Sequence, residues 1–128
     1  MTKYRAYDGG SLNRMYQPDE VMVGNGDIWI IDEDSVAGEW IVNNDIHLMQ
    51  STGLLDKNGK EIFEGDIVDY EGRKAVIKWH GHYASFVYIF VDELQKIVAG
   101  WSPLYPAYFR FEVIGNKFET PEFLEVKE

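Results

Sequence analysis

Residues 48–68 read LMQSTGLLDKNGKEIFEGDIV, and this stretch indicates how the chain folds. Its middle holds Asn58-Gly59, a pair typical of tight β-hairpin turns because both turn residues must tolerate a positive φ angle. We expect the apolar residues after the turn to enter a strand, and Gly65-Asp66 to bend the chain before a further strand. Thr52 and Asp56 have short side chains that can hydrogen-bond to the local backbone. Because the whole stretch has a structural interpretation, it favours a turn-and-strand element over an active site.

Apolar runs separated by turn residues recur along the rest of the chain. Val21 to Ile31 contains two such runs around Asn25-Gly26, and Glu71-Gly72 separates two more. Ser85 to Val91 is apolar on both faces of a strand, which indicates a central strand or a covered edge. A last strand is expected over residues 109–114. Many short strands with frequent turns predict a mainly β fold, either a small barrel or a rolled antiparallel sheet, with one or two short helices.

Helix signals are confined to two short segments. Asp92 to Ala99 places its apolar residues on one helical face, with Asp92 as a cap and Gly100 as a stop, and predicts a helix of about two turns. Thr120-Pro121 can open a second helical turn, because proline suits the first position of a helix. Two prolines predict a loop over residues 101–108.

Length and composition indicate one domain that covers residues 1–128. Strands before residue 50 and a second group after residue 60 are compatible with two subregions of that domain. The chain has no cysteine, which excludes disulfides, thiolate metal sites and cysteine nucleophiles. No apolar run resembles a signal peptide or approaches the roughly 20 residues of a membrane span. We therefore expect a cytoplasmic protein that does not associate with a membrane.

The net charge of −10 is distributed unevenly. Residues 1–64 carry 12 acids and 5 bases, a net −7, whereas residues 65–128 carry 10 acids and 7 bases, a net −3. A field of this sign repels phosphate and disfavours direct binding of nucleic acid. The acidic surface either keeps the protein soluble or competes with DNA for a basic partner.

Motifs for catalysis, metals and cofactors are incomplete. Gly59-Lys60 is followed by a glutamate where a phosphate loop needs serine or threonine. His80 and His82 would share one face of a strand, but two ligands do not make a metal site, and the glycine between them favours a turn. The 22 acidic residues offer pairs without distinguishing spacing, such as Asp66 with Asp69 and Asp32 with Asp34. We therefore expect no catalytic residues, no metal site, no cofactor and no enzymatic activity.

The segment from Trp101 to Phe109 is the most suggestive binding surface in the sequence. Aromatic side chains next to proline form rigid platforms on which sugars, bases or peptides can stack. Trp101, Tyr105 and Tyr108 are the candidate binding residues. The same residues are more typical of a core or of an oligomer interface than of a ligand site, because tyrosine and tryptophan are enriched in both, and all three interpretations stay open here.

The stretch of residues 48–68 resembles the YopX family of phage and prophage proteins, which share a Met-Gln-aromatic-Thr-Gly-Leu segment, an Asp-Lys-Asn-Gly-Lys-Glu turn and a Glu-Gly-Asp-Ile-Val strand. Residues 3–8 with Met15-Tyr16 are similar to the family's N-terminal signature, and residues 111–116 with 120–124 to its C-terminal one. Departures from the family pattern affect packing: Tyr7 stands in place of tryptophan, Ser51 in place of an aromatic residue and Phe123 in place of leucine. The resemblance implies a small, mostly β protein encoded by a phage or prophage, with no catalytic residues to carry over.

Three functional hypotheses follow. The first is an accessory protein that acts in the host cytoplasm through contacts with a phage or host protein, with a homo-oligomer as one form of contact. The second is an acidic DNA mimic or inhibitor of a host enzyme. The third is a barrel that binds a small molecule or a sugar at the aromatic loop.

Overall fold

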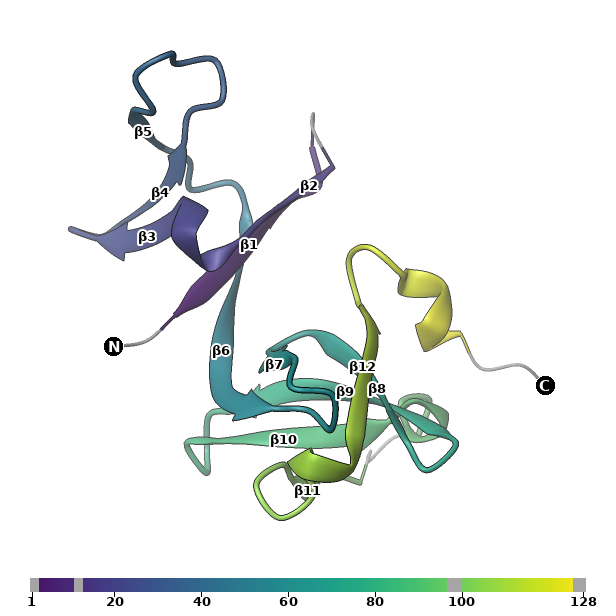
Figure 1. The fold of residues 1–128 in the computed structure, drawn as a ribbon. Helices are drawn as coiled ribbons and strands as arrows, with labels where there is room; N and C mark the ends of the chain where they lie inside the picture. Colours follow the sequence, from purple (N-terminus) through teal and green to yellow (C-terminus); the bar gives the residue numbers. More distant parts are fainter. Residues whose placement is uncertain (1–2, 11–12, 97–99, 126–128) are drawn as a thin grey trace. The chain divides into compact units, whose positions relative to one another are not determined.

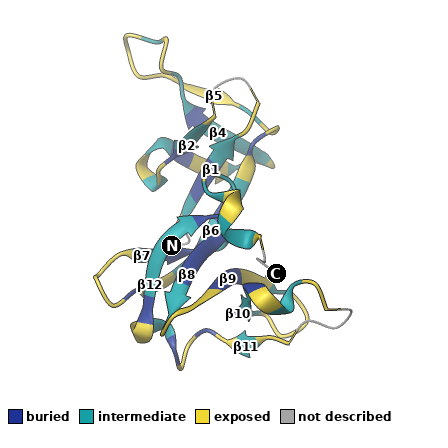
Figure 2. Ribbon diagram, turned by 90° about the vertical axis from the view of Figure 1, so that its right-hand side faces the viewer, coloured by how far each residue is buried: buried dark blue, intermediate teal, exposed yellow. Residues whose placement is uncertain are grey.

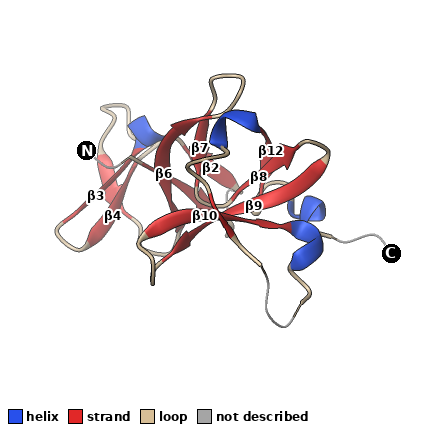
Figure 3. Ribbon diagram, turned by 90° about the horizontal axis from the view of Figure 1, so that it is seen from below, coloured by secondary structure: helices blue, strands red, loops and turns tan. Residues whose placement is uncertain are grey.

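The computed structural model describes residues 3–10, 13–96 and 100–125. The chain divides into two compact units, Met1–Gln50 and Ser51–Glu128. Both units consist of antiparallel strands joined by turns and short 3-10 segments, which confirms the mainly β class with a rolled antiparallel sheet (Figure 3). Within the described residues, no helix has the length and apolar character needed to cross a bilayer.

The first unit contains two small groups of strands (Figure 1). β1 lies between β2 and the first part of β6 in a curled antiparallel arrangement, and β4 lies between β3 and β5. Its elements are β1 (Tyr4–Asp8), β2 (Arg14–Tyr16), η1 (Pro18–Glu20), β3 (Val21–Gly24), β4 (Asp27–Ile31), β5 (Trp40–Val42) and the start of β6 (His47–Leu55). A small core joins both groups and is built on Ala6, Tyr16, Val21, Ile30 and Ile46.

The hairpin predicted at Asn25-Gly26 connects β3 to β4. Gly24 is opposite Asp27, and the two turn residues have φ angles of 54° and 81°. Two successive positive φ angles match the right-handed twist of the flanking strands, which is why asparagine and glycine occupy the turn.

The second unit is organised around a five-stranded antiparallel sheet in the order β11-β10-β9-β8-β12. Its elements are β7 (Glu61–Phe63), β8 (Asp66–Tyr70), β9 (Arg73–His80), β10 (Ser85–Phe90), η2 (Val91–Glu93), β11 (Ser102–Pro103), η3 (Tyr108–Arg110), β12 (Phe111–Asn116) and η4 (Pro121–Leu124). The predicted turn at Glu71-Gly72 joins β8 to β9, with φ angles of 53° and 91°. The predicted apolar strand Ser85–Val91 is β10, which is covered on its outer side by β11.

Aromatic side chains fill the core of this unit. Tyr88 of β10 is buried, and its ring lies 5.1 Å from that of Phe111 and 5.9 Å from that of Tyr70. Both contacts are edge-to-face, the arrangement that aromatic rings prefer in cores. The aromatic residue at the centre of β10 is therefore buried within the subunit and is not available to an oligomer interface.

The stretch of residues 48–68 forms β6, a turn, β7 and the start of β8. Gly53 has a φ of 75° and creates a bulge in β6, where the hydroxyls of Ser51 and Thr52 accept backbone hydrogen bonds at 3.0 and 3.1 Å. Asp56 is buried, and its carboxylate accepts hydrogen bonds from the backbone N–H groups of Asn58, Lys60 and Val113 at 2.8–2.9 Å. The prediction that Thr52 and Asp56 bond to the backbone is confirmed. Through Val113, the turn also stabilises one edge of the five-stranded sheet.

Three predicted boundaries were wrong. In place of a two-turn helix from Asp92, a 3-10 segment covers Val91–Glu93, because the Leu94 N–H bonds to the carbonyl of Val91, three residues back; residues 97–99 of that prediction lie outside the described residues. The last strand begins at Phe111, since the two preceding residues belong to η3. The loop over residues 101–108 contains the short strand β11, where proline is tolerated because the strand forms a sheet edge.

Candidate protein-binding surface

One face of the β3-β4-β5 sheet carries apolar side chains that remain exposed. Met22 is opposite Trp29, which is in turn opposite Val42, so the three side chains form a row across the sheet. Trp40 lies two residues before Val42 and shares this face. Met22 and Val42 are 46% and 44% exposed, Trp40 is 36% exposed, and Trp29 is half-buried. We call these four residues the outer face.

The opposite face of the same sheet accounts for this exposure. Val21 and Ile30, which are opposite each other, point into the core of the first unit. Val23 and Ile41 lie on the same face but are 46% and 43% exposed, so this face is packed only around Val21 and Ile30. Because successive side chains of a strand point to opposite sides, burying these two residues directs Met22 and Trp29 outward. The Trp29 indole N–H donates to the carbonyl of Gly24 at 3.2 Å, which fixes the ring on the outer face. β5, whose three side chains are all exposed, is the most exposed strand of the sheet (Figure 2).

Acidic residues flank β5 at both of its ends. Asp34 and Glu39 belong to the loop before β5, and Asp45 follows it; all three are exposed. Residues 1–50 carry 9 acids and 3 bases, a net −6, so more than half of the chain's net charge of −10 belongs to this unit. The outer face is therefore an apolar surface in a negative field.

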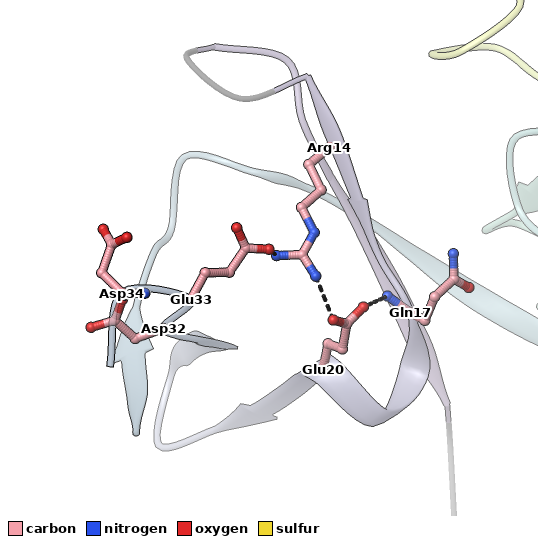
Figure 4. A network of polar contacts seen from close by, with 6 residues as sticks. All are labelled: Arg14, Gln17, Glu20, Asp32, Glu33 and Asp34. Carbon is pink, nitrogen blue, oxygen red and sulfur yellow. Dashed lines mark hydrogen bonds and ion pairs between the residues drawn. The ribbon is translucent and has the colours of Figure 1, made fainter. Parts of the chain in front are cut away.

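Arg14 of β2 sets the position of the acidic loop between β4 and β5 (Figure 4). Its guanidinium forms ion pairs with Glu20 of η1 and Glu33 of the loop. Glu33 thus points toward the body of the unit, whereas Asp32 and Asp34 point away from the arginine. These acids border a hollow of about 250 Å³ that also contacts Tyr16 and Ile41, among other residues.

The three candidate residues of the aromatic loop separate into two groups. The Trp101 ring contacts those of His80 and Tyr83, with centroids 4.8 and 5.1 Å apart. The rings of Tyr105 and Tyr108 lie 6.0 Å apart. Tyr105 is 72% exposed, whereas Tyr108 is half-buried against the core of the second unit.

The histidines and carboxylate pairs of the sequence do not converge on a common site. His80 ends β9, and His82 belongs to the turn after it, with a ring separation of 6.5 Å. The residues that the structure describes contain no group of three or more histidines, aspartates or glutamates arranged to hold a metal ion. Asp66 is buried and accepts a hydrogen bond from the Phe63 backbone, whereas Asp69 lies three residues further along β8 and thus on its other face.

Sequence reasoning missed the outer face. No strand was expected at Trp40–Val42, because this short triplet lies between an acidic loop and the polar pair Asn43-Asn44. Its β-branched and aromatic residues were the available signal. The exposure of Met22 could not be inferred from the sequence, since it depends on which side of β3 the core occupies.

Comparison with known proteins agrees with this fold. The solved structure of protein EF1440 from Enterococcus faecalis is similar, with a TM-score of 0.62 and 26% sequence identity over 98% of this chain and 99% of that one. No match was found among curated proteins. The family model described as YopX protein matches residues 3–125, which is nearly the whole chain. The chain therefore belongs to the YopX family.

Proposed function

We propose that this YopX protein is a non-enzymatic binding module of a phage or prophage that acts in the host cytoplasm through protein–protein contacts. Its acidic first unit binds a protein with a basic surface, and the outer face supplies the apolar part of the contact. The observation that carries the proposal is the row Met22–Trp29–Val42, in which Met22 and Val42 are exposed and Trp29 is half-buried, on a sheet whose other face contributes Val21 and Ile30 to the core. Exposed apolar patches rimmed by polar groups are typical of interaction sites.

The composition of the surface supports this function. Methionine and tryptophan are enriched at the centre of protein interfaces, and acids at the rim steer a basic partner toward the site. Each of the half-exposed side chains would contribute about 1 kcal/mol when covered, which corresponds to roughly fivefold in affinity.

The test starts with cross-linking in host cells that carry the phage, followed by purification of the cross-linked partner. Affinity for that partner is then measured for Met22→Thr, Val42→Thr and the control Leu55→Thr, which changes an apolar residue 52% exposed in the second unit. We expect each outer-face variant to weaken binding about fivefold and the control to leave it unchanged. Equal affinity for all three variants would refute the proposal.

The salt dependence of the same complex indicates the kind of partner. A basic protein partner predicts affinity that falls as ionic strength rises, because the acidic rim is exposed. If the partner is a DNA-binding enzyme and Asp34→Asn or Glu39→Gln weakens the complex more than Val42→Thr does, the protein acts as an acidic DNA mimic.

A second candidate function is the binding of a sugar or another small ring at Trp101. Tyr83 and Trp101 are 60% and 40% exposed, and their rings meet at an interplanar angle of 47° beside His80. Exposed aromatic rings can stack on the faces of ring-shaped ligands. Thermal-shift screening of mono- and oligosaccharides tests this function, with Trp101→Ala as the variant that should abolish any stabilisation seen with the wild type.

A further inference from the structure

β5 is a free edge of its sheet. Within the described part of the chain the sheet has the order β3-β4-β5, and there β5 has a hydrogen-bonded neighbour only on the side of β4. Among the residues that the structure describes, no backbone or side-chain group bonds to the main chain of Trp40 or Val42. Such an edge can pair with another extended chain.

The hydrogen-bond pattern shows which groups of β5 point outward. The Asn43 N–H donates to the carbonyl of Ile28, and the Asp32 N–H donates to the carbonyl of Glu39. In an antiparallel pair, residues alternate between bonding to the neighbour and pointing away from it. Ile41 is therefore bonded to β4, whereas the N–H and C=O groups of Trp40 and Val42 point away from the sheet.

The outward backbone groups belong to the two residues of β5 that lie on the outer face. A strand added beside β5 would place the side chains opposite Trp40 and Val42 on the same face, next to theirs. It would thereby extend the row that begins at Met22. One added segment would therefore both pair with the outward backbone groups of β5 and contact the apolar side chains of the outer face.

Charge determines which segment fits. Glu39 comes directly before β5, and Asp45 follows three residues after it. A second copy of β5, paired antiparallel about Ile41, would bring the Glu39 end of one chain to the Asp45 end of the other. This arrangement places acid against acid, whereas a segment with lysine or arginine at both ends would complement both.

We propose that β5 binds an extended segment of the partner protein by strand addition. The segment has apolar residues at alternate positions and basic residues at both ends. This inference rests on the proposed function, since it names the type of partner and the mode of binding at the same surface.

The first test uses a synthetic peptide in which valine and threonine alternate, with two lysines at each end. Hydrogen exchange of the full-length protein is followed by NMR with and without this peptide. We expect the Ile41 amide to be protected in the free protein, and the Trp40 and Val42 amides to become at least about tenfold slower to exchange only when the peptide is bound. Unchanged exchange at Trp40 and Val42 at saturating peptide would overturn strand addition.

The second test uses matched variants at one position. Val42→Pro removes the outward N–H and keeps the bonds to β4, whereas Val42→Thr keeps the N–H and changes only the side chain. Peptide affinity should fall at least about tenfold further in Val42→Pro than in Val42→Thr, with the NMR spectrum of the first unit otherwise retained. Equal affinity of these variants would overturn the proposal.

Together these variants distinguish the proposed binding function from the proposed mode of binding. If Met22→Thr weakens binding of the cellular partner but Val42→Pro and Val42→Thr bind it equally, the protein-binding function stands and strand addition is wrong. If protection of Trp40 and Val42 increases with protein concentration alone, together with a dimer in sedimentation, the occupant is a second copy and the proposed segment is wrong. If no outer-face variant affects the partner, the proposed function fails as well.

Discussion

Replacing Asp56 by asparagine tests how the turn between β6 and β7 stabilises the second unit. The Asp56 carboxylate is buried, and one oxygen accepts from the N–H groups of Asn58 and Lys60 at 2.9 and 2.8 Å, while the other accepts from Val113 at 2.9 Å. Burial opposes the ionised form, but the three N–H donors, with Lys60 nearby, favour it more, so the pKa of Asp56 is lowered from its ordinary value of 3.8.

The structure gives the size of the effect. Asparagine can keep the bonds to the turn, but its amide NH₂ would face the Val113 N–H, donor against donor. Losing a charge-assisted bond and leaving a buried N–H unsatisfied costs about 2–4 kcal/mol, out of about 5–15 kcal/mol for a typical domain. Asp56→Ala should cost more, because all three donors then lose their acceptor.

The pH dependence has a definite sign. Because the folded pKa is below the unfolded one, ionised Asp56 contributes stability that is fully present above the unfolded pKa of about 3.8 and is lost as pH falls through the folded pKa. Asp56→Asn removes this contribution, so the difference in stability between wild type and variant should shrink in acid.

Urea unfolding at neutral and acidic pH measures both quantities. The control is Asp69→Asn, which affects a carboxylate with a single bond of 3.4 Å in the next turn and should cost less than about 0.5 kcal/mol. If Asp56→Asn at neutral pH destabilised no more than this control does, the turn would not hold the sheet edge as described.

Three further predictions concern local geometry. Gly115→Ala should reduce the free energy of unfolding by about 1–3 kcal/mol in urea, because an added Cβ would overlap the side chain of Thr120. A cost near zero would show that Thr120 can move aside and that its contact with β12 is not tight. Arg14→Gln should cost about 1 kcal/mol or less, since the ion pairs are partly exposed, but should speed hydrogen exchange in the loop of residues 32–39; unchanged exchange would contradict its positioning role. Gly26→Ala should cost about 1 kcal/mol more than Gly24→Ala, because only Gly26 has a positive φ; similar unfolding midpoints for the two variants would contradict the turn assignment.

Local signals in the sequence predicted the turns and the strands next to them. Asn25-Gly26 and Glu71-Gly72 have positive φ angles at both residues, and each pair forms a turn between strands. At Asn58-Gly59 only the glycine has a positive φ, so the expectation for Asn58 was wrong: the turn is longer, with the Asp56 N–H donating to the carbonyl of Lys60. The short-range hydrogen bonds that the side chains of Thr52 and Asp56 accept from the backbone were also predictable, because short polar side chains reach nearby N–H groups. Element boundaries were less predictable where the backbone hydrogen bonds link residues three positions apart, as in a 3-10 turn, instead of four apart, as in an α-helix. Val91–Glu93 is such a case.

The candidate surface depends on tertiary arrangement, and this limited its prediction. The third bond of Asp56, to Val113, spans 57 residues and has no local signature. The aromatic loop was expected to act as one surface, but Trp101 lies against His80 while Tyr105 lies against Tyr108. The outer face is visible only when the register places Met22, Trp29 and Val42 in one row.

Hydrogen exchange of the protein in complex with its purified cellular partner shows whether β5 is the binding surface. We predict slower exchange in β5, at the Trp40 and Val42 amides, with little change around Tyr83 and Trp101. Protection confined to the region of Tyr83 and Trp101, with β5 unchanged, would contradict this prediction and would transfer the binding function to the second unit.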